Sequence, residues 1–189
     1  MFPVHQAGIP TNIRNTNRPD HPGTIISLDA PRDNGLPTIT GIAGRKGFSV
    51  IQVEKAMMNG ELGFGRKVLQ VLEEFGISFE HLPTGIDTMS VVVASETLKG
   101  KREDIIAAIM DRVHPDILDI HDNMSLVATV GRGMVHNCGT AARLFAAMAR
   151  MGINVRMIDQ GSSELSIIVG VDDDDFERTI RSIYREFVG

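Results

Sequence analysis

A loop at residues 58–64 combines the residue types that bind a carboxylate. In order, these are Met58, Asn59, Gly60, Glu61, Leu62, Gly63 and Phe64. The loop leads into a segment whose apolar residues recur at helical spacing, which places it at a helix N-terminus. Glycines let a backbone approach a ligand closely, and the first amides and dipole of a helix favour negative charge.

The following strand and turn contribute a second group of polar and aromatic residues: Ser78, Phe79, Glu80, Thr84, Gly85, Ile86 and Asp87. Glu80 or Asp87 has the charge to bind an ammonium group. However, Phe64 and Phe79 are also typical of a hydrophobic core, and Ser78 and Glu80 are also typical of a solvent-facing strand. The residue types alone leave a ligand site and a structural role open.

Other chemical candidates are weaker. His114, Asp116, Asp119 and His121 have metal-ligating types, but on a strand the first two point to one face and the last two to the other. Four acidic residues at 172–175 open a helical pattern and are explained by capping and the helix dipole. We therefore expect no metal or other cofactor.

Composition excludes several classes of protein. The 189 residues carry a net charge of −5 and 23% charged residues, without a basic stripe for nucleic acid or anionic lipid. Apolar runs are too short to span a bilayer. Cys138 is a single cysteine, expected to be a small buried residue, and indicates a reducing cytoplasm.

An internal repeat organises most of the chain. At an offset of 76 residues, Gly63 matches Gly139 and Gly76 matches Gly152. In the first copy, the patterns predict a helix at 63–75, strands at 77–82 and 89–94, and a helix at 101–113. Leading strands are predicted at 48–53 and 125–130. Each copy is thus a ferredoxin-like βαββαβ unit.

The strand count predicts that the two units are interwoven. The first unit finds its last strand at 116–120, whereas the second ends in a helix at 174–187 and lacks one strand. A spare strand at 38–43 would complete the second sheet, because an edge would otherwise stay open. The first unit would then be inserted into the second. Residues 1–36, with a strand-like stretch at 11–14, have too little apolar content for a core.

These motifs carry a resemblance to aspartate kinases. Residues 41–93 resemble the first ACT domain of that family and residues 128–171 the second, in which the run MIDQGSSE at 157–164 is highly specific. Residues 7–26, AGIPTNIRNTNRPDHPGTII, look like the last stretch of the amino-acid-kinase domain, with Arg14 where the family often has lysine. The phosphate-binding and aspartate-binding motifs of that domain have no counterpart here.

The resemblance implies an α+β fold of two ACT units with antiparallel sheets and helices on one face. Its domains would be 1–36, a remnant of the catalytic domain with a linker; 37–45, the strand completing the second unit; 46–122, the first ACT; and 123–189, the second. By resemblance, the effector site maps to Met58, Asn59, Gly60, Glu61, Gly63, Phe64, Ser78, Phe79, Glu80, Thr84, Gly85 and Asp87. A second effector or interface site maps to Met134, Val135, Asn137, Gln160, Ser162 and Ser163.

The implied function is allosteric feedback inhibition, by lysine alone or with threonine, of the first step of aspartate-family amino acid biosynthesis. The implied partners are a catalytic domain or subunit, which would hold ATP and magnesium, and a second copy in a homodimer. The chain alone would be catalytically inactive and cytoplasmic. The alternatives are a separately encoded regulatory subunit and the regulatory ACT module of another amino-acid enzyme.

Overall fold

A computed structural model describes residues 2–28 and 37–189 of the chain, which divides into two compact units at Leu36 and Pro37. The N-terminal unit contains a helix, α1 (Phe2–Gln6), and an antiparallel pair of strands, β1 (Thr11–Ile13) and β2 (Thr24–Ile26). Its helix buries no residue, in agreement with the low apolar content of this segment.

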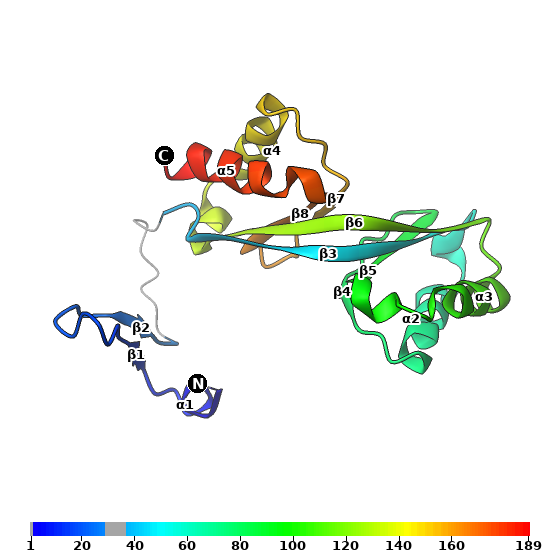
Figure 1. Ribbon diagram of the computed structural model, residues 1–189, viewed down its shortest axis with the longest axis horizontal. Helices are drawn as coiled ribbons and strands as arrows, with labels where there is room; N and C mark the ends of the chain where they lie inside the picture. Colours follow the sequence, from blue (N-terminus) through cyan, green and yellow to red (C-terminus); the bar gives the residue numbers. More distant parts are fainter. Residues whose placement is uncertain (1, 29–36) are drawn as a thin grey trace. The chain divides into compact units, whose positions relative to one another are not determined.

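The larger unit is built on one antiparallel sheet of six strands in the order β4-β5-β3-β6-β8-β7 (Figure 1). The strands are β3 (Gly41–Glu54), β4 (Phe79–His81), β5 (Thr88–Ala94), β6 (Ile117–Val130), β7 (Met157–Asp159) and β8 (Ser166–Asp172). The helices are α2 (Phe64–Glu74), α3 (Arg102–Val113), α4 (Thr140–Arg150) and α5 (Phe176–Phe187). Short 3-10 turns lie at η1 (Met58–Gly60), η2 (Ser95–Leu98), η3 (Arg132–His136) and η4 (Asp173–Asp175).

Two ferredoxin-like halves share the central strands β3 and β6, and this sharing confirms the predicted insertion. The first half uses the end of β3 and the start of β6, with β4, β5, α2 and α3. The second half uses the end of β6 with β7, β8, α4 and α5, and borrows the start of β3, where Gly41 lies opposite Val130. The spare strand at the front therefore completes the second sheet.

The division of these central strands was predicted incorrectly. The strands expected at 38–43 and 48–53 form one strand, and those expected at 116–120 and 125–130 form another. Gly47 and Asn123 have left-handed backbone angles, with φ of 88° and 59°. They lie where the register of β3 and β6 shifts, so they bend the ladder as bulges without ending it. Sequence-based boundaries at 45/46 and 122/123 fall inside these strands.

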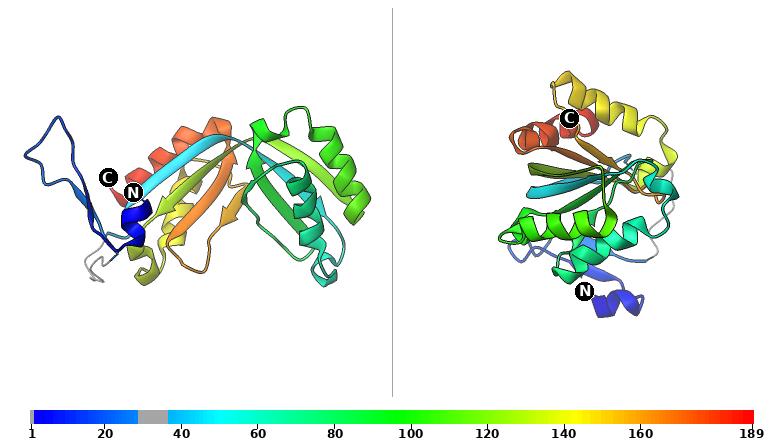
Figure 2. Two further views of the ribbon diagram at one scale, coloured as in Figure 1. Left: turned by 90° about the horizontal axis from the view of Figure 1, so that it is seen from below. Right: turned by 90° about the vertical axis from the view of Figure 1, so that its right-hand side faces the viewer.

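Three apolar clusters hold the larger unit together. One lies between α2, α3 and the first half of the sheet, and a second between α4, α5 and the second half, and each helix pair covers its own part of the sheet (Figure 2). The third contains residues of strands from both halves and no helix residue: Phe48, Val50, Val92, Met124, Leu126 and Met157. This third cluster packs the two halves together into a single folded unit.

Glycines begin and end the first helix of each half at matching positions. Gly63 and Gly139 precede α2 and α4 with φ of 80° and 86°, and Gly76 and Gly152 follow them with φ of 69° and 64°. Only glycine adopts these angles without strain. The predicted helix at 63–75 is confirmed, while the strand expected at 77–82 is shorter and spans Phe79–His81.

One buried hydroxyl gives a stability prediction. Thr129 on β6 is fully buried, and its hydroxyl oxygen has no hydrogen-bond partner among residues 2–28 and 37–189. An unpaired buried hydroxyl costs about 1–3 kcal/mol. Thr129→Val is therefore expected to raise the free energy of unfolding by about 1 kcal/mol, measured by urea denaturation. Thr179→Val is the control and should lower it, because the Thr179 hydroxyl donates to the Asp175 carbonyl at 2.8 Å.

Candidate functional site

The loop between β3 and α2 is held from within by a charged triad. The two oxygens of Glu61 accept hydrogen bonds from Lys55 Nζ at 2.6 Å and from Lys67 Nζ at 2.7 Å. Lys55 Nζ also donates to the carbonyl of Val113, at the end of α3, at 2.6 Å. These hydrogen bonds, that of Lys55 first, lower the pKa of Glu61 to about 2. Both oxygens of Glu61 are thus engaged, and its carboxylate supports the loop.

The turn between β4 and β5 is joined to the same loop. Asp87 accepts the Met57 N–H through Oδ1 at 2.8 Å, and its carbonyl accepts the Lys55 N–H at 2.9 Å. The Asn59 N–H donates to the carbonyl of Ile86 at 3.1 Å. Met57 has a left-handed φ of 58°, which this bonding holds. The structure therefore brings the predicted residues of the loop and of the turn at 84–87 together.

Free backbone donors gather at the start of α2. Within the described part of the chain, no group accepts a hydrogen bond from the amides of Leu62, Gly63 and Gly65. The side chains of Met58 and Phe64 are 4% and 3% exposed and belong to the first core cluster. Any ligand here would contact the backbone and not these two side chains. Such oriented amides at a helix N-terminus suit a carboxylate.

Ser78, Phe79 and Glu80 lie at the other end of α2. The helix has 11 residues, about 16 Å at 1.5 Å per residue, and separates them from Gly63. Ser78 and Phe79 line an open groove of about 590 Å³ along α2 and the edge strand β4. Glu80 pairs with Arg45 at 3.2 Å on the exposed surface. One chain thus holds the predicted effector residues in two separate groups.

The matching loop of the second half is built differently. Lys55, Glu61 and Lys67 correspond to Gly131, Asn137 and Arg143, so the triad is absent there. Arg143 instead donates to Glu186 of α5 at 2.9 Å.

The predicted residues of the second site also divide between structure and surface. The side chain of Met134 is buried in the second core, and Asn137 Nδ2 donates to the Gly133 carbonyl at 2.7 Å. Val135 is exposed, as are Gln160, Ser162 and Ser163 in the loop after β7. This second group lacks a carboxylate able to bind an ammonium group.

A side-chain contact that the sequence patterns did not indicate joins the two halves. His81 Nδ1 on β4 lies 2.6 Å from Asp159 Oδ2 on β7. These strands form opposite edges of the sheet and belong to different halves. Residues 78 positions apart carry no periodic signal, so only the folded sheet reveals this pair.

Residues considered for other chemistry have structural roles. Asp116 accepts the Ala56 N–H at 2.7 Å, and His121 lies 3.0 Å from the Gln52 side-chain oxygen. Across residues 2–28 and 37–189, no three His, Cys, Asp or Glu side chains form a metal-binding group. Cys138 is exposed, which corrects the expected burial, because it lies in the turn before α4. No helix in the described ranges is long and apolar enough to cross a membrane.

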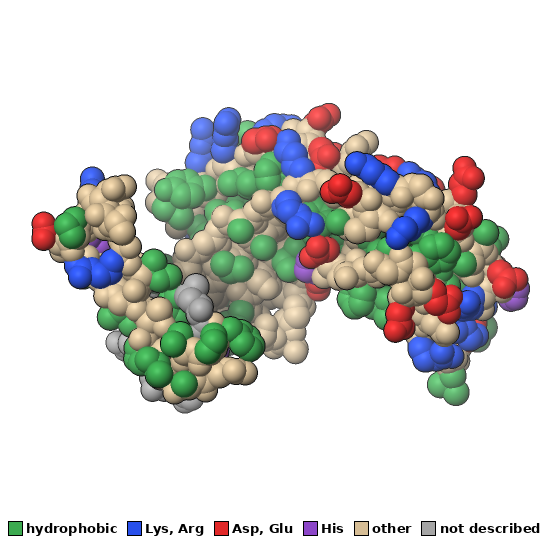
Figure 3. Space-filling model, turned by 60° about the horizontal axis from the view of Figure 1, so that its bottom comes forward, with side chains coloured by type: hydrophobic (Ala, Val, Ile, Leu, Met, Phe, Trp, Pro, Cys, Tyr) green, Lys and Arg blue, Asp and Glu red, His purple; other side chains and the backbone are tan. Residues whose placement is uncertain are grey.

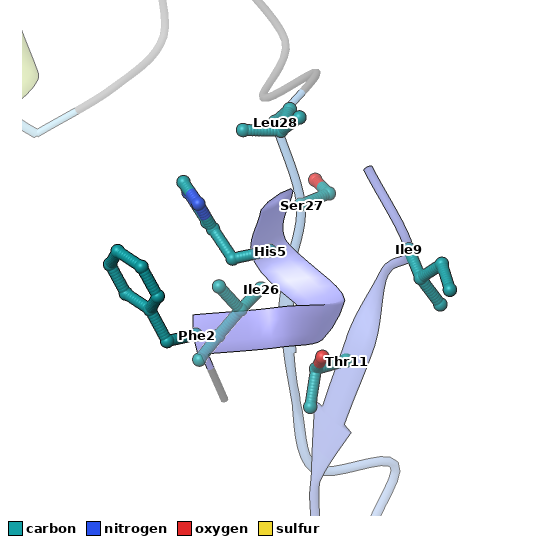
Figure 4. A pocket seen from close by; sticks show the side chains of 7 residues that line it. All are labelled: Phe2, His5, Ile9, Thr11, Ile26, Ser27 and Leu28. Atoms are coloured by element: carbon teal, nitrogen blue, oxygen red, sulfur yellow. The ribbon is translucent and has the colours of Figure 1, made fainter. Parts of the chain in front are cut away.

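The N-terminal unit has a pocket of its own, of about 280 Å³, shown in Figure 4. Phe2, Ile9, Ile26 and Leu28 give it an apolar lining. It has no carboxylate or cationic cluster that would recognise the charged groups of a free amino acid. The molecular surface seen in Figure 3 differs from this apolar pocket, because acidic and basic side chains are interspersed on it.

The lowered pKa of Glu61 predicts a dependence on pH. Because the folded pKa is about 2 and the usual value is 4.5, the carboxylate stabilises the fold above about pH 4.5 and loses that effect as pH falls toward 2. Glu61→Gln should lower the melting temperature at pH 7, and the difference from the native chain should shrink steadily between pH 5 and about 2. Thermal unfolding across this range tests it. Glu73→Gln, on the exposed side of α2, is the control and should show no such convergence.

Comparisons with known proteins agree with this architecture. A family model described as an ACT domain matches residues 127–187. Aspartokinase 3 of Bacillus subtilis (strain 168) is 38% identical over 188 residues, which are 99% of this chain and 41% of that protein. The chain thus spans about two-fifths of the length of this relative.

Two solved structures extend the comparison. The crystal structure of Clostridium acetobutylicum aspartate kinase superposes with a TM-score of 0.91 and 52% identity, over 98% of this chain and 43% of that one. A chain from a crystal structure of aspartokinase alpha and beta subunits gives a TM-score of 0.67 and 25% identity, over 79% of this chain and 98% of that one. Together, the family match, the relatives and the two interwoven βαββαβ halves show that this chain is of the aspartokinase type and is built from two ACT units.

Proposed function

We propose that this region binds a free amino acid at the loop 57–63 and the turn 84–87 of the first ACT unit. The observation that carries the proposal is the set of unpaired amides of Leu62, Gly63 and Gly65, at the end of a loop whose Asn59 N–H is bonded to the turn that holds Asp87. The amides suit a carboxylate. Asp87 uses Oδ1 for the Met57 N–H, and Oδ2 has no partner among the described residues, so it is free to accept an ammonium group.

The effector that fits this charge pattern best is L-lysine, with L-threonine as a second effector. Lysine carries a second ammonium group, and Glu80 is the remaining predicted acid of the first unit, because Glu61 is engaged by Lys55 and Lys67. Glu80 lies on β4, at the far end of α2 from the loop. We therefore propose a homodimer in which the β4 edge of one subunit lies beside the loop of its partner and completes the site.

Features of the β4 edge support this dimer. It is one of the two short edge strands of the sheet, and Phe79 is 47% exposed there. Exposed strand edges with apolar side chains are suited to pairing with another chain. A site made of two half-sites would also couple effector binding to the dimer, since each ligand would contact both subunits.

Regulation of the catalytic part would follow from the thermodynamic linkage between effector binding and the arrangement of the ACT units. An effector that binds one arrangement of the ACT units more tightly shifts the whole protein toward that arrangement. In a longer aspartokinase, this shift would reduce phosphorylation of aspartate in the cytoplasm, as feedback inhibition of the first step of aspartate-family biosynthesis. ATP and magnesium would bind the catalytic part, and this region alone would be inactive. The same device would serve a separately encoded regulatory subunit.

Calorimetric titration tests the proposal. The chain should bind L-lysine, and Asp87→Ala should raise the dissociation constant at least about tenfold, equivalent to about 1.4 kcal/mol. Glu80→Ala should weaken binding as well. Asp104→Ala, which removes an exposed acid of α3, is the control and should leave affinity unchanged. Absence of binding by lysine, threonine and both together would contradict the proposal.

A further inference from the structure

The segment 37–40 leads into β3 and packs against the second half. Ile39 is 7% exposed and belongs to the second core cluster. The Thr40 N–H donates to the Val130 carbonyl at 2.7 Å. This is the segment through which the chain enters the second half of the sheet.

Two glycines let the loop at 131–136 lie directly against this segment. A Cβ atom on Gly131 would overlap the Thr38 carbonyl oxygen and would lie 2.5 Å from Ile39 Cα. One on Gly133 would lie 2.5 Å from the Pro37 carbonyl oxygen and 3.0 Å from Thr38 Cα. All of these are backbone atoms, which cannot turn aside as a side chain can. The contact is therefore between two backbones, and a side chain at either glycine would force them apart.

The matching place in the first half is built without such a contact. Lys55 and Met57 occupy the positions that correspond to Gly131 and Gly133. There the entering chain is the connection from α3 to β6, and the Asp116 N–H donates to the Glu54 carbonyl at 2.8 Å, as Thr40 does to Val130. Lys55 Nζ donates hydrogen bonds to the Val113 carbonyl and to the Glu61 carboxylate. The second half replaces a charged side-chain link by direct backbone packing.

We propose that the loop at 131–136 is a clamp for the segment 37–40, so that this loop and the start of β3 are held or released together. The same loop carries Met134 and Val135, and Asn137 fixes it by donating to the Gly133 carbonyl. A change in the conformation of the loop at 131–136 must therefore change the packing of the segment 37–40. By reciprocity, release of the segment must loosen the loop. This inference is independent of the effector site proposed in the first unit.

Hydrogen exchange of the 189-residue chain, measured without ligand, tests the clamp. Gly131→Ala and Gly133→Ala are each expected to speed exchange of the Thr40 amide roughly tenfold or more. Val91 to Val93 on β5 of the first half should keep their protection. Gly161→Ala is the matched control in the second half, because a Cβ there meets no atom within 4 Å, and it should leave exchange at Thr40 unchanged.

Ile39→Ala is the second, independent variant, since it loosens the segment without altering the loop. It should speed exchange both at residue 40 and across residues 131–136, while the loop at 57–62 of the first half stays unchanged. If the two glycine variants fail to fold, Ile39→Ala decides alone. Unchanged exchange at Thr40 in folded glycine variants would overturn the clamp. So would an Ile39→Ala variant in which residue 40 is released and residues 131–136 keep their protection.

Discussion

Deletion of residues 37–44 is expected to unfold the second ACT unit while the first stays folded. The deletion removes Ile39 and Ile42 from the second core and leaves the end of β6 without its partner β3. Gly44, where an added Cβ would lie 2.6 Å from the Phe176 ring, is lost as well. The first half keeps residues 48–54 of β3, which pair with all of β5.

Residue-resolved hydrogen exchange distinguishes the two halves. Amides of β8 should lose protection in the deletion variant, and amides of β5 should retain it. Deletion of residues 15–22, also eight residues long and confined to the N-terminal unit, is the control and should leave β8 protected. Retained protection of β8 after loss of residues 37–44 would refute the interwoven fold.

Phe48→Ala is expected to lower the free energy of unfolding by about 3–5 kcal/mol. Phe48 is 3% exposed in the third cluster, which joins strands of both halves, and the Arg45 guanidinium lies 4.5 Å from its ring centre. A cavity at this place removes contacts from both halves at once. We therefore also expect the halves to unfold less cooperatively.

Urea denaturation followed at sites in each half measures both effects. In the native chain, the unfolding transitions of the two halves should coincide. In the variant, the two transitions should occur at lower urea concentrations and should be broader. Phe79→Ala removes the same side chain from a site that is 47% exposed and should change stability by about 0.5 kcal/mol or less. Equal effects of the two substitutions would contradict a shared core between the halves.

The repeat allowed much of this fold to be predicted because its signals are local. Gly63 and Gly139 mark helix starts, Gly76 and Gly152 mark helix ends, and the missing strand implied the insertion. The bulges at Gly47 and Asn123 escaped prediction. Both residues have left-handed backbone angles, which occur in turns as well as in bulges, and only the pairing of β3 with β6 distinguishes the two. Periodicity cannot report that pairing.

The candidate site was predicted only in part for a similar reason. Residue types pointed to the loop at 58–64, but the engagement of Glu61 depends on Lys55 and Lys67, which reach it only once the loop has folded. The separation of Glu80 from that loop follows from the length of α2. The contact between His81 and Asp159 depends on two sheet edges that are far apart in sequence.

The most direct test of the central claim is a map of amide chemical shifts of the labelled chain during titration with L-lysine. An effector site in the first ACT unit predicts saturable shifts at residues 57–65 and 84–87, with smaller shifts at residues 78–80 from the partner subunit's edge. The amides of Leu62, Gly63 and Gly65 should move most. Saturable shifts confined to the second half, or none at millimolar lysine and threonine, would contradict it.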